Sequence, residues 1–391
     1  MMQLVNWFME EEYEIIWAST AIRSEHSVQL DALNVRSHQI YLNDPSFDDL
    51  VAAEQPDVVL FDRFITEEQF GWRVAEHCPK AIRILDTEDL HFLRKARREA
   101  IREDRIFNKE DLYTETAKRE LASILRCDLS LIISEVEMNL LIQEFKIPHG
   151  LLLYLPIWMK GLSNTETNAL PKFSERKDFI HLGNFKHAPN LDAVIQLKRS
   201  IWPQIRNHIP TAKLHIYGAY APQQIKEMHQ PSEGFLVEGW AEDSRDVLSG
   251  SKVLLAPLRF GAGLKGKILN AMQNGTPTVT TAIGAEGISG DLPFGGFQED
   301  SDSSFIEKAI ALYENESIWQ TAQDHGFDII QKRFQRKAFT DLLNKRIEEL
   351  YQNISSHRRE HFMGQLLHHH TMTAHKYMSK WIEVKNKDIG S

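Results

Sequence analysis

The sequence predicts an α/β protein made of two parallel-sheet domains in tandem. Short, almost continuously apolar runs recur at intervals that leave room for a helix between them, which is typical of parallel strands buried on both faces. In the first half these runs are EIIWA (14–18), VVLF (58–61), IRIL (82–85), LSLII (129–133) and LLLYL (151–155). The length of 391 residues, at about 150 residues per domain, likewise predicts two to three domains.

A second alternation of strands and helices follows a polar stretch. Residues 161–178 are rich in Ser, Asn and Thr and contain Pro171, so we expect a linker there. The predicted strands beyond it are 179–182, 213–218, 234–239, 252–258 and 276–281, and the predicted helices include 190–202 and 265–274. The expected organisation is an N-terminal domain (1–160), a linker (161–178), a C-terminal domain (179–355) and a helical, His-rich tail (356–391).

Composition excludes several classes of protein. The chain carries 45 basic and 55 acidic side chains, a net charge of −10, which argues against a nucleic-acid binder. Two cysteines, Cys78 and Cys127, are too few for a disulfide framework, so a reducing cytoplasm is expected. The longest apolar runs fall short of the ~20 residues of a membrane-spanning helix. The N-terminus has no basic region preceding an apolar run, so no secretion signal is expected.

The segment 256–288 has the clearest functional signal, because a strand leads into a Gly-rich turn and then a helix. Gly261, Gly263 and Gly266 let the backbone approach a ligand closely, and the free N–H groups of the helix start favour an anion. Lys265 and Lys267 lie in the first helical turn, where cations are unfavourable for the helix itself. A bound phosphate or diphosphate would offset that cost, so the segment predicts an anion site.

Arg259, at the end of the preceding strand, is interpreted either as a third positive contact or as a surface charge. The glycines also have an alternative interpretation, in which they only allow the helix to pack closely on the strand.

A dinucleotide-binding oxidoreductase is a competing interpretation, since GAGLKG matches the G-x-G-x-x-G pattern. The match occurs far from the first strand of the chain, however. The strand that follows it, TPTVTT, ends in threonine rather than in the acid that would hold a ribose. The pattern therefore favours this class only weakly.

Residues 176–350 resemble the donor-binding half of a family 4-type glycosyltransferase, a retaining enzyme of the GT-B fold. The segments that carry the resemblance are FIHLGNFKHAPNLDAV, AKLHIYG, FLVEGW, KVLLAPLRFGAGLKGKILNAM, NGTPTVTTAIGAEGI and FIEKAIALYENESIWQ. The resemblance implies two Rossmann-like domains facing a cleft. It implies a nucleotide-sugar donor bound mainly by the C-terminal domain, a sugar, lipid or other hydroxyl acceptor bound mainly by the N-terminal domain, and no metal or other cofactor.

The resemblance also assigns residues to the donor site. Gly183 and Asn184 are expected to line the cleft, Trp240 to lie near the base, and Lys265 and Lys267 to contact the diphosphate. Asn270 departs from the family pattern, which has a glutamate there that typically holds the donor ribose. Asparagine still forms hydrogen bonds but loses a charge-assisted one worth about 1.5–3 kcal/mol, which puts donor affinity or activity in doubt.

A second departure concerns the start of the chain. Folds of this type open with a strand and a Gly-rich loop, whereas MMQLVNWFMEEE predicts the helix that would follow them. We therefore expect an incomplete N-terminal domain, because the start was assigned late or because the strand has been lost.

On the N-terminal side, Asp86, Asp89 and His91 follow a buried strand, at the sheet edge where open α/β proteins bind ligands. Within FDRF…RILDTEDLHFLR, which resembles the acceptor side of the same family, His91 and Asp89 are the catalytic candidates. His91 would contact the transferred sugar or an acceptor hydroxyl; its alternative is a cleft histidine that caps a helix. Asp89 has the alternative of a carboxylate at a helix start.

The basic run that follows, Arg94, Lys95, Arg97 and Arg98, either attracts an anionic acceptor or forms a solvated helix face, and the second interpretation is preferred.

The tail 356–391 holds six histidines, six Lys or Arg and three acidic residues. Three adjacent histidines on a helix point in different directions, so HHH at 368–370 does not predict a metal site. The tail is expected to pack as an amphipathic helix on the body, with contact to a membrane surface as the alternative.

The predicted function is transfer of a sugar from a nucleotide-diphosphate donor to a hydroxyl acceptor, in polysaccharide or glycolipid assembly as the resemblance implies. The alternative is a noncatalytic nucleotide-sugar-binding or scaffold protein of the same fold. A third interpretation, an epimerase, has no residue that favours it over transfer.

Overall fold

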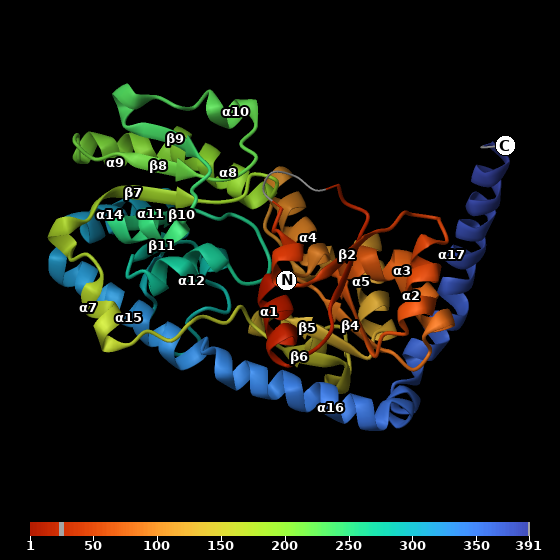
Figure 1. The fold of residues 1–391 in the computed structure, drawn as a ribbon. Coiled ribbons are helices and arrows are strands. Elements are labelled where there is room, and N and C mark those ends of the chain that lie inside the picture. Colours follow the sequence, from red (N-terminus) through yellow and green to blue (C-terminus); the bar gives the residue numbers. More distant parts are fainter. Residues whose placement is uncertain (23–26, 390–391) are drawn as a thin grey trace.

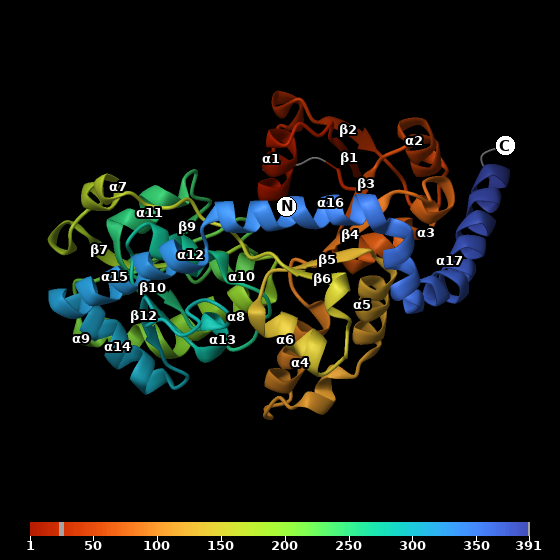
Figure 2. The same cartoon turned by 90° about the horizontal axis from the view of Figure 1, so that it is seen from below.

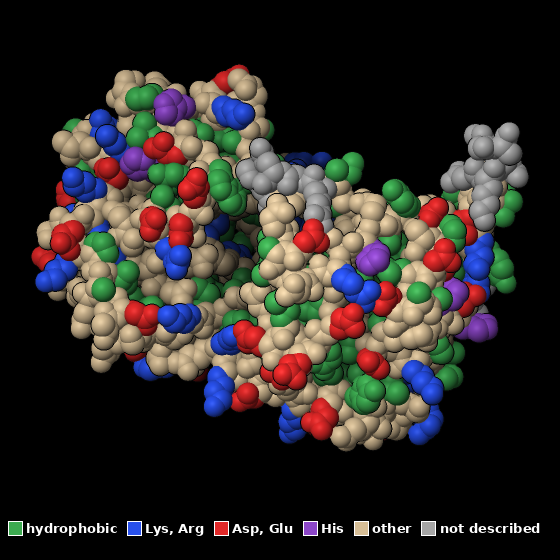
Figure 3. Space-filling view, viewed as in Figure 1, with side chains coloured by type: hydrophobic (Ala, Val, Ile, Leu, Met, Phe, Trp, Pro, Cys, Tyr) green, Lys and Arg blue, Asp and Glu red, His purple; other side chains and the backbone are tan. Residues whose placement is uncertain are grey.

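The computed structural model describes residues 1–22 and 27–389, with the side chains of 370–373 and 386–389 left out. Two α/β halves lie side by side, and the last two helices run along them (Figure 1). Lys, Arg, Asp and Glu side chains are interspersed over the face in Figure 3, as expected for a solvated surface.

The N-terminal half is built on a parallel sheet of four strands in the order β3-β4-β5-β6. Its strands are β3 (Val58–Asp62), β4 (Ile82–Asp86), β5 (Leu129–Ile132) and β6 (Leu152–Tyr154). Its helices are α1 (Met2–Glu10), α2 (Ser46–Glu54), α3 (Arg63–His77), α4 (His91–Arg102), α5 (Glu115–Arg126) and α6 (Glu135–Gln143). All five residues of β4 are buried, in agreement with a central strand covered on both faces.

The predicted strand at 14–18 forms, as β1 (Ile16–Ser19), but it pairs outside the main sheet. It makes a separate parallel pair with β2 (Arg36–Gln39), in which Trp17 lies opposite Ser37. The apolar pattern did not predict β2, because its sequence RSHQ is polar and mostly exposed. Within the described residues, β3 therefore forms one edge of the four-stranded sheet.

The C-terminal half contains a parallel sheet of six strands in the order β12-β11-β10-β7-β8-β9. The strands are β7 (Lys177–Leu182), β8 (Leu214–Tyr217), β9 (Phe235–Gly239), β10 (Ser251–Ala256), β11 (Thr278–Thr280) and β12 (Gly296–Gln298). The helices are α7 (Asn164–Ala169), α8 (Ala188–Gln196), α9 (Trp202–His208), α10 (Gln223–Lys226), α11 (Ser244–Gly250), α12 (Gly266–Gln273), α13 (Ala282–Ala285), α14 (Asp302–Glu314) and α15 (Glu316–Arg333).

The chain changes direction of winding between β7 and β10. Because β7 pairs with β8 on one side and with β10 on the other, the loops after β7 and β10 leave the sheet as neighbours. In open α/β sheets, ligands bind in the crevice at such a point. The predicted helix 190–202 is broken here into α8, a π-helical turn over 197–201 and α9, whose first turn contains Pro203.

The last two helices, α16 (Arg336–Glu360) and α17 (Phe362–Ile389), return to the N-terminal half. Leu343, Ile347 and Leu350 of α16 pack in one cluster with Trp7 of α1 and Ile84 of β4, and Figure 2 shows α16 spanning both halves. The predicted helical tail is confirmed. Because α16 already packs on the N-terminal half, the C-terminal half ends before residue 355, the predicted boundary.

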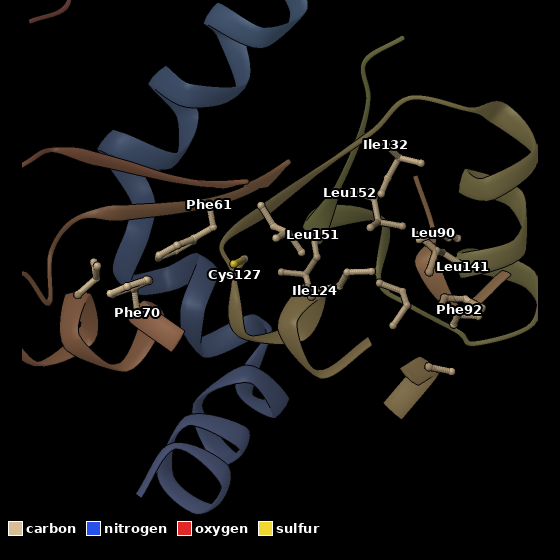
Figure 4. Packing of buried hydrophobic residues seen from close by; sticks show 14 of the residues in the cluster. Phe61, Phe70, Leu90, Phe92, Ile124, Cys127, Ile132, Leu141, Leu151 and Leu152 are labelled. Carbon is tan, nitrogen blue, oxygen red and sulfur yellow. The ribbon is translucent and has the colours of Figure 1, made fainter. Parts of the chain in front are cut away.

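Buried apolar side chains form separate cores in the two halves. In the N-terminal half, Phe61, Phe70, Phe92, Ile124 and Leu141 belong to one cluster between the sheet and α3, α4, α5 and α6 (Figure 4). In the C-terminal half, one cluster lies on each face of the six-stranded sheet. Each fully buried aliphatic or aromatic side chain contributes about 1.5–3 kcal/mol, so the cores hold the strand ends in place.

Candidate functional site

The C-terminal strand ends of the two sheets lie against each other. Gly263 follows β10, and Asp89 follows β4. A methyl group built on Gly263 would lie 2.9 Å from Cβ of Asp89 and 3.0 Å from Cδ1 of Ile133. Gly263 also has a φ of +64°, so both its conformation and this close approach require glycine. The two sequence-predicted sites therefore face one interdomain cleft.

Lys265 is the N-cap residue of α12 and is almost fully buried, with 8% of its surface exposed. Its Nζ donates a hydrogen bond to the carbonyl of Gly263 at 2.9 Å and lies 3.9 Å from Oε2 of Glu286. Burial lowers the pKa of the Lys265 ammonium, and the nearby Glu286 carboxylate opposes that shift. Burial thus removes water from the Lys265 ammonium, and the nearby carboxylate offsets only part of the free energy lost.

Lys267 lies in the first turn of the same helix. Its Nζ donates to Oδ1 of Asn190 at 2.6 Å, and burial lowers its pKa to about 7. A neutral amide compensates a buried ammonium poorly. Two lysines therefore gather at a helix N-terminus, where an external anion would be stabilised by their ammonium forms and by the helix dipole and would in turn favour those forms.

Asn190 connects Lys267 to the loop after β7. Its Nδ2 donates to the carbonyl of Asn184 at 2.8 Å, and a methyl group built on Gly183 would lie 2.6 Å from Cγ of Asn190. The structure thus brings Gly183, Asn184 and Lys267 together. Sequence reasoning missed Asn190; the available signal was an amide in the first turn of a helix that follows a predicted loop.

The remaining predicted donor-side residues lie in the same half. Arg259 is ion-paired with Asp192 of α8, Nε to Oδ2 at 2.9 Å, so an acidic partner already compensates its charge. Asn270 is partly buried on α12, one turn after Lys267. Trp240 follows β9 with 57% of its surface exposed. Their roles in binding stay predictions.

His91 begins α4 on the opposite wall of the cleft and is 8% exposed. Burial, reinforced by the positive charge of Arg94, lowers the pKa of its imidazole to about 3, so the ring is neutral at physiological pH. Its Nε2 lies 3.4 Å from Oδ1 of Asp89, and Oδ2 of Asp89 lies 3.2 Å from Nε of Arg94. His91 is therefore positioned to exchange hydrogen bonds rather than to carry a charge.

Two buried glutamates, which sequence reasoning missed, complete the start of α4. Glu120 accepts hydrogen bonds from the backbone N–H groups of His91 (3.1 Å) and Phe92 (3.0 Å). Glu137 accepts from the N–H groups of Leu90 and Gly263, both at 2.8 Å. Burial raises the pKa of both carboxyl groups, that of Glu120 to about 8. The N-cap residue is Leu90, whose side chain has no oxygen to accept from the N–H groups at the start of α4. The carboxyl groups of Glu120 and Glu137, far along the chain, accept from these N–H groups instead.

Further contacts join the halves across the cleft. Both guanidinium Nη atoms of Arg97 donate to the carboxylate of Glu286 at 2.7 Å, and Nη1 also donates to the carbonyl of Gly261 at 2.8 Å. Arg333 pairs with Glu135 at 2.6 Å. The interpretation of the basic run as a solvated helix face is thus wrong for Arg97, whose side chain is only 11% exposed. Arg97 instead binds the Gly-rich turn through the carbonyl of Gly261 and the carboxylate of Glu286.

A hollow of about 590 Å³ lies elsewhere, between α1 and the start of α16. Gln3, Asn6, Trp158 and Arg336 are among its lining residues, and none of the residues lining it belongs to the predicted site. We place the site at the interdomain cleft because the strand ends, the glycine turn and the two lysines converge there. Among the described residues, no three His, Cys, Asp or Glu side chains are grouped so that they could hold a metal ion; the side chain of His370 lies outside them.

Comparisons with known proteins agree with this architecture. Residues 176–315 match the family model of the glycosyl transferases group 1. A curated relative, an uncharacterized 44.6 kDa protein in the cps region of Klebsiella pneumoniae, is 23% identical over 174 residues, or 42% of this chain and 45% of that protein. The chain thus aligns with less than half of that relative's length.

Solved structures share the fold over most of the chain. A glycosyltransferase from Rickettsia africae aligns with a TM-score of 0.66 and 9% identity, covering 90% of this chain and 94% of its own. Anabaena HepE in complex with UDP aligns with a TM-score of 0.64 and 11% identity. The alignment covers 89% of this chain and 96% of HepE. A mutant of S. aureus TarM in complex with UDP, Fondaparinux and alpha-GlcNAc-glycerol aligns with a TM-score of 0.59 and 11% identity. The alignment covers 78% of this chain and 58% of TarM.

These findings confirm the resemblance. The chain has the GT-B fold of glycosyltransferases, with two Rossmann-like halves that face a cleft, and its C-terminal half carries the sequence pattern of the group 1 enzymes.

Proposed function

We propose that this protein transfers a sugar from a nucleoside-diphosphate sugar to a hydroxyl acceptor. The observation that carries the proposal is the pair of lysines at the start of α12. Nζ of the buried Lys265 lies 3.9 Å from the carboxylate of Glu286, and Nζ of the partly buried Lys267 has a neutral amide as its partner. A diphosphate at this position would replace weak partners by charge-assisted hydrogen bonds. UDP in the structures of HepE and TarM supports the same ligand class here.

The donor would bind across the loops that follow β7 and β10. Its diphosphate would contact Lys265, Lys267 and the backbone of the Gly261–Gly266 turn. Its sugar would extend toward Gly183 and Asn184, and Trp240 would lie beside the base. As the glycosidic bond breaks, negative charge develops on the departing diphosphate, and preorganised ammonium and N–H groups stabilise that charge most where water is excluded. Two lysines would supply the positive charge that a metal ion provides in other transferases.

The acceptor would enter from the N-terminal wall. A neutral His91 can accept or donate one hydrogen bond with a sugar or acceptor hydroxyl, and Asp89 beside it would orient the ring. We propose retention of the anomeric configuration, a cytoplasmic location, and a role in polysaccharide or glycolipid assembly, all on the strength of the family likeness.

Binding requires the cleft to open. Glu137 occupies the N–H of Gly263, and Arg97 occupies the carbonyl of Gly261. The closed arrangement therefore uses the N–H of Gly263, which the diphosphate would need, while Arg97 fixes the glycine turn through the carbonyl of Gly261. The two halves would move apart to admit the donor and close again over it, as is common in transferases with two domains.

A noncatalytic nucleotide-sugar-binding protein is a second candidate, favoured by Asn270 at the position of the family's ribose-binding glutamate. Titration calorimetry with UDP-, GDP- and ADP-sugars, followed by an assay for released nucleoside diphosphate with a panel of hydroxyl acceptors, separates the two. Binding with turnover is the expected result. Binding without turnover favours the second candidate, and no binding of any nucleotide-sugar contradicts both.

A further inference from the structure

The terminal helix α17 is docked on the N-terminal half through one of its faces. Nη2 of Arg73 donates to Oγ of Ser379 at 3.0 Å, and Nζ of Lys376 pairs with Glu76 of α3 at 2.8 Å. A methyl group built on Gly364 would overlap the carbonyl oxygen of Leu125, so the helix touches α5 directly. These contacts fix which face of α17 points outward.

The outward face carries a stripe of large apolar side chains. Its members, which we call the outer stripe, are Met363, Leu366, Tyr377, Trp381 and Val384, with exposed fractions of 55%, 42%, 66%, 63% and 60%. Steps of three, eleven, four and three residues place these positions on one side of a helix. An exposed apolar stripe of this kind marks an interaction surface.

The position of the helix leaves this stripe accessible to a flat surface. In both ribbon views α17 forms the outer edge of the molecule, on the side away from the C-terminal half (Figures 1 and 2). The same edge of Figure 3 shows hydrophobic side chains together with Lys, Arg, His, Asp and Glu. At about 1.5 Å per residue, the 28 residues of the helix span about 42 Å.

The charge of this segment identifies the partner. Residues 362–389, which form α17, contain four lysines and two acidic residues, whereas the whole chain has a net charge of −10. Lys380 and Lys385 flank Trp381, and Nζ of Lys385 lies 5.2 Å from the centre of the Trp381 ring. A second copy of the chain would bring two positively charged helices together, while an anionic surface complements them.

We propose that the outer stripe of α17 binds the surface of an anionic lipid membrane, with the helix lying in the plane of the headgroups. Tyr and Trp rings suit this region because one part of each ring system is apolar and another forms hydrogen bonds. Lysines beside the stripe reach the lipid phosphates, as in other interfacial amphipathic helices. Within the described part of the chain no helix is both long and apolar enough to span a bilayer. The proposal is independent of the donor site.

Sedimentation of the full chain with lipid vesicles tests this proposal. The native chain is expected to bind vesicles that contain phosphatidylglycerol and to bind vesicles of phosphatidylcholine alone much more weakly. Replacing the centre of the stripe, Tyr377→Ser, Trp381→Ser and Val384→Ser together, is expected to weaken binding more than about tenfold. A matched control, Ile106→Ser with Tyr113→Ser, removes exposed apolar side chains from the segment between α4 and α5 and is expected to leave binding unchanged.

A second variant keeps the test valid if the stripe variant does not fold. Lys380→Gln with Lys385→Gln is expected to weaken binding by about fivefold per lysine at low salt. The proposal is overturned if the native chain does not bind phosphatidylglycerol vesicles, or if a folded stripe variant binds them as tightly. A native dimer that the stripe variant converts to a monomer, without vesicle binding, would assign the surface to a second copy instead.

Discussion

Glu137 of the N-terminal half accepts a hydrogen bond from the backbone N–H of Gly263, at 2.8 Å across the domain boundary. The N–H belongs to the glycine turn that the proposed donor contacts. A carboxylate and a diphosphate would therefore compete for one donor group.

Removing that negative charge should favour the nucleotide. Burial raises the pKa of Glu137 to about 7, so its carboxyl group is mostly charged at about pH 8. At that pH we expect Glu137→Gln to bind a nucleoside diphosphate about three- to tenfold more tightly, because like charges near one site repel each other. Calorimetric titration of both proteins with UDP, GDP and ADP provides the comparison. Glu135→Gln, which alters the pair with Arg333 outside the turn, is the matched control. Unchanged or weaker nucleotide binding by Glu137→Gln would show that the contact is not competitive.

His91 should act on the transfer step and not on donor affinity. Its imidazole lies on the N-terminal wall and is neutral because burial lowers its pKa to about 3. We expect His91→Ala to lower kcat by about a hundredfold or more, with the Kd for the nucleotide-sugar changed less than about threefold. A parallel loss of affinity, or an unchanged kcat, would remove His91 from the proposed chemistry. The NMR signal of its ring should show no titration between about pH 5 and pH 8.

Asn270 offers a gain-of-function test. Introducing the carboxylate of the family pattern, Asn270→Glu, should add a charge-assisted hydrogen bond to the donor ribose worth about 1.5–3 kcal/mol. Affinity for the nucleotide-sugar should rise at least about tenfold, measured by calorimetry. Gln273→Glu, in the last turn of α12, is a suitable control. A nucleotide-sugar affinity that stays the same in Asn270→Glu would place the ribose elsewhere.

Glu120 should make stability depend on pH in a defined direction. Its folded pKa of about 8 lies above its usual value, because of burial. Its stabilising contribution is therefore complete below its usual pKa and is lost as the pH rises through about 8. Relative to Glu120→Gln, the native protein should lose about 1.4 kcal/mol of unfolding free energy per pH unit in that window. Urea denaturation across the range gives the measurement, and parallel profiles for the two proteins would contradict the assignment.

The sequence predicted most of the fold because its strands are short, apolar and buried on both faces, as in β4 and β10. It did not predict β2, whose four residues are polar, or β12, which has three residues. The return of α16 to the N-terminal half was also missed. An amphipathic pattern shows that a helix has an apolar face, but it does not show which sheet that face covers.

The candidate site was predictable where one continuous segment carries it. The glycine turn and Lys265 and Lys267 follow directly from residues 256–273. The role of Glu137 was not predictable, because it depends on a contact with a residue 126 positions away. For Asn190 the sequence shows an amide in the first turn of a helix, but not its contact with Lys267, 77 positions away. Arg97 looked like a solvated charge for the same reason, since Glu286 lies 189 positions away.

The central claim is that Lys265 and Lys267 at the start of α12 bind the diphosphate of a nucleotide. The most direct test is calorimetric titration of the Lys265→Met, Lys267→Met double variant with whichever of UDP, GDP and ADP binds the native chain most tightly. Lys226→Met, an exposed lysine of α10 in the same half, is the control, and circular dichroism checks folding. Loss of two charge-assisted contacts predicts an affinity at least about a hundredfold lower. An affinity equal to that of the native chain would contradict the claim.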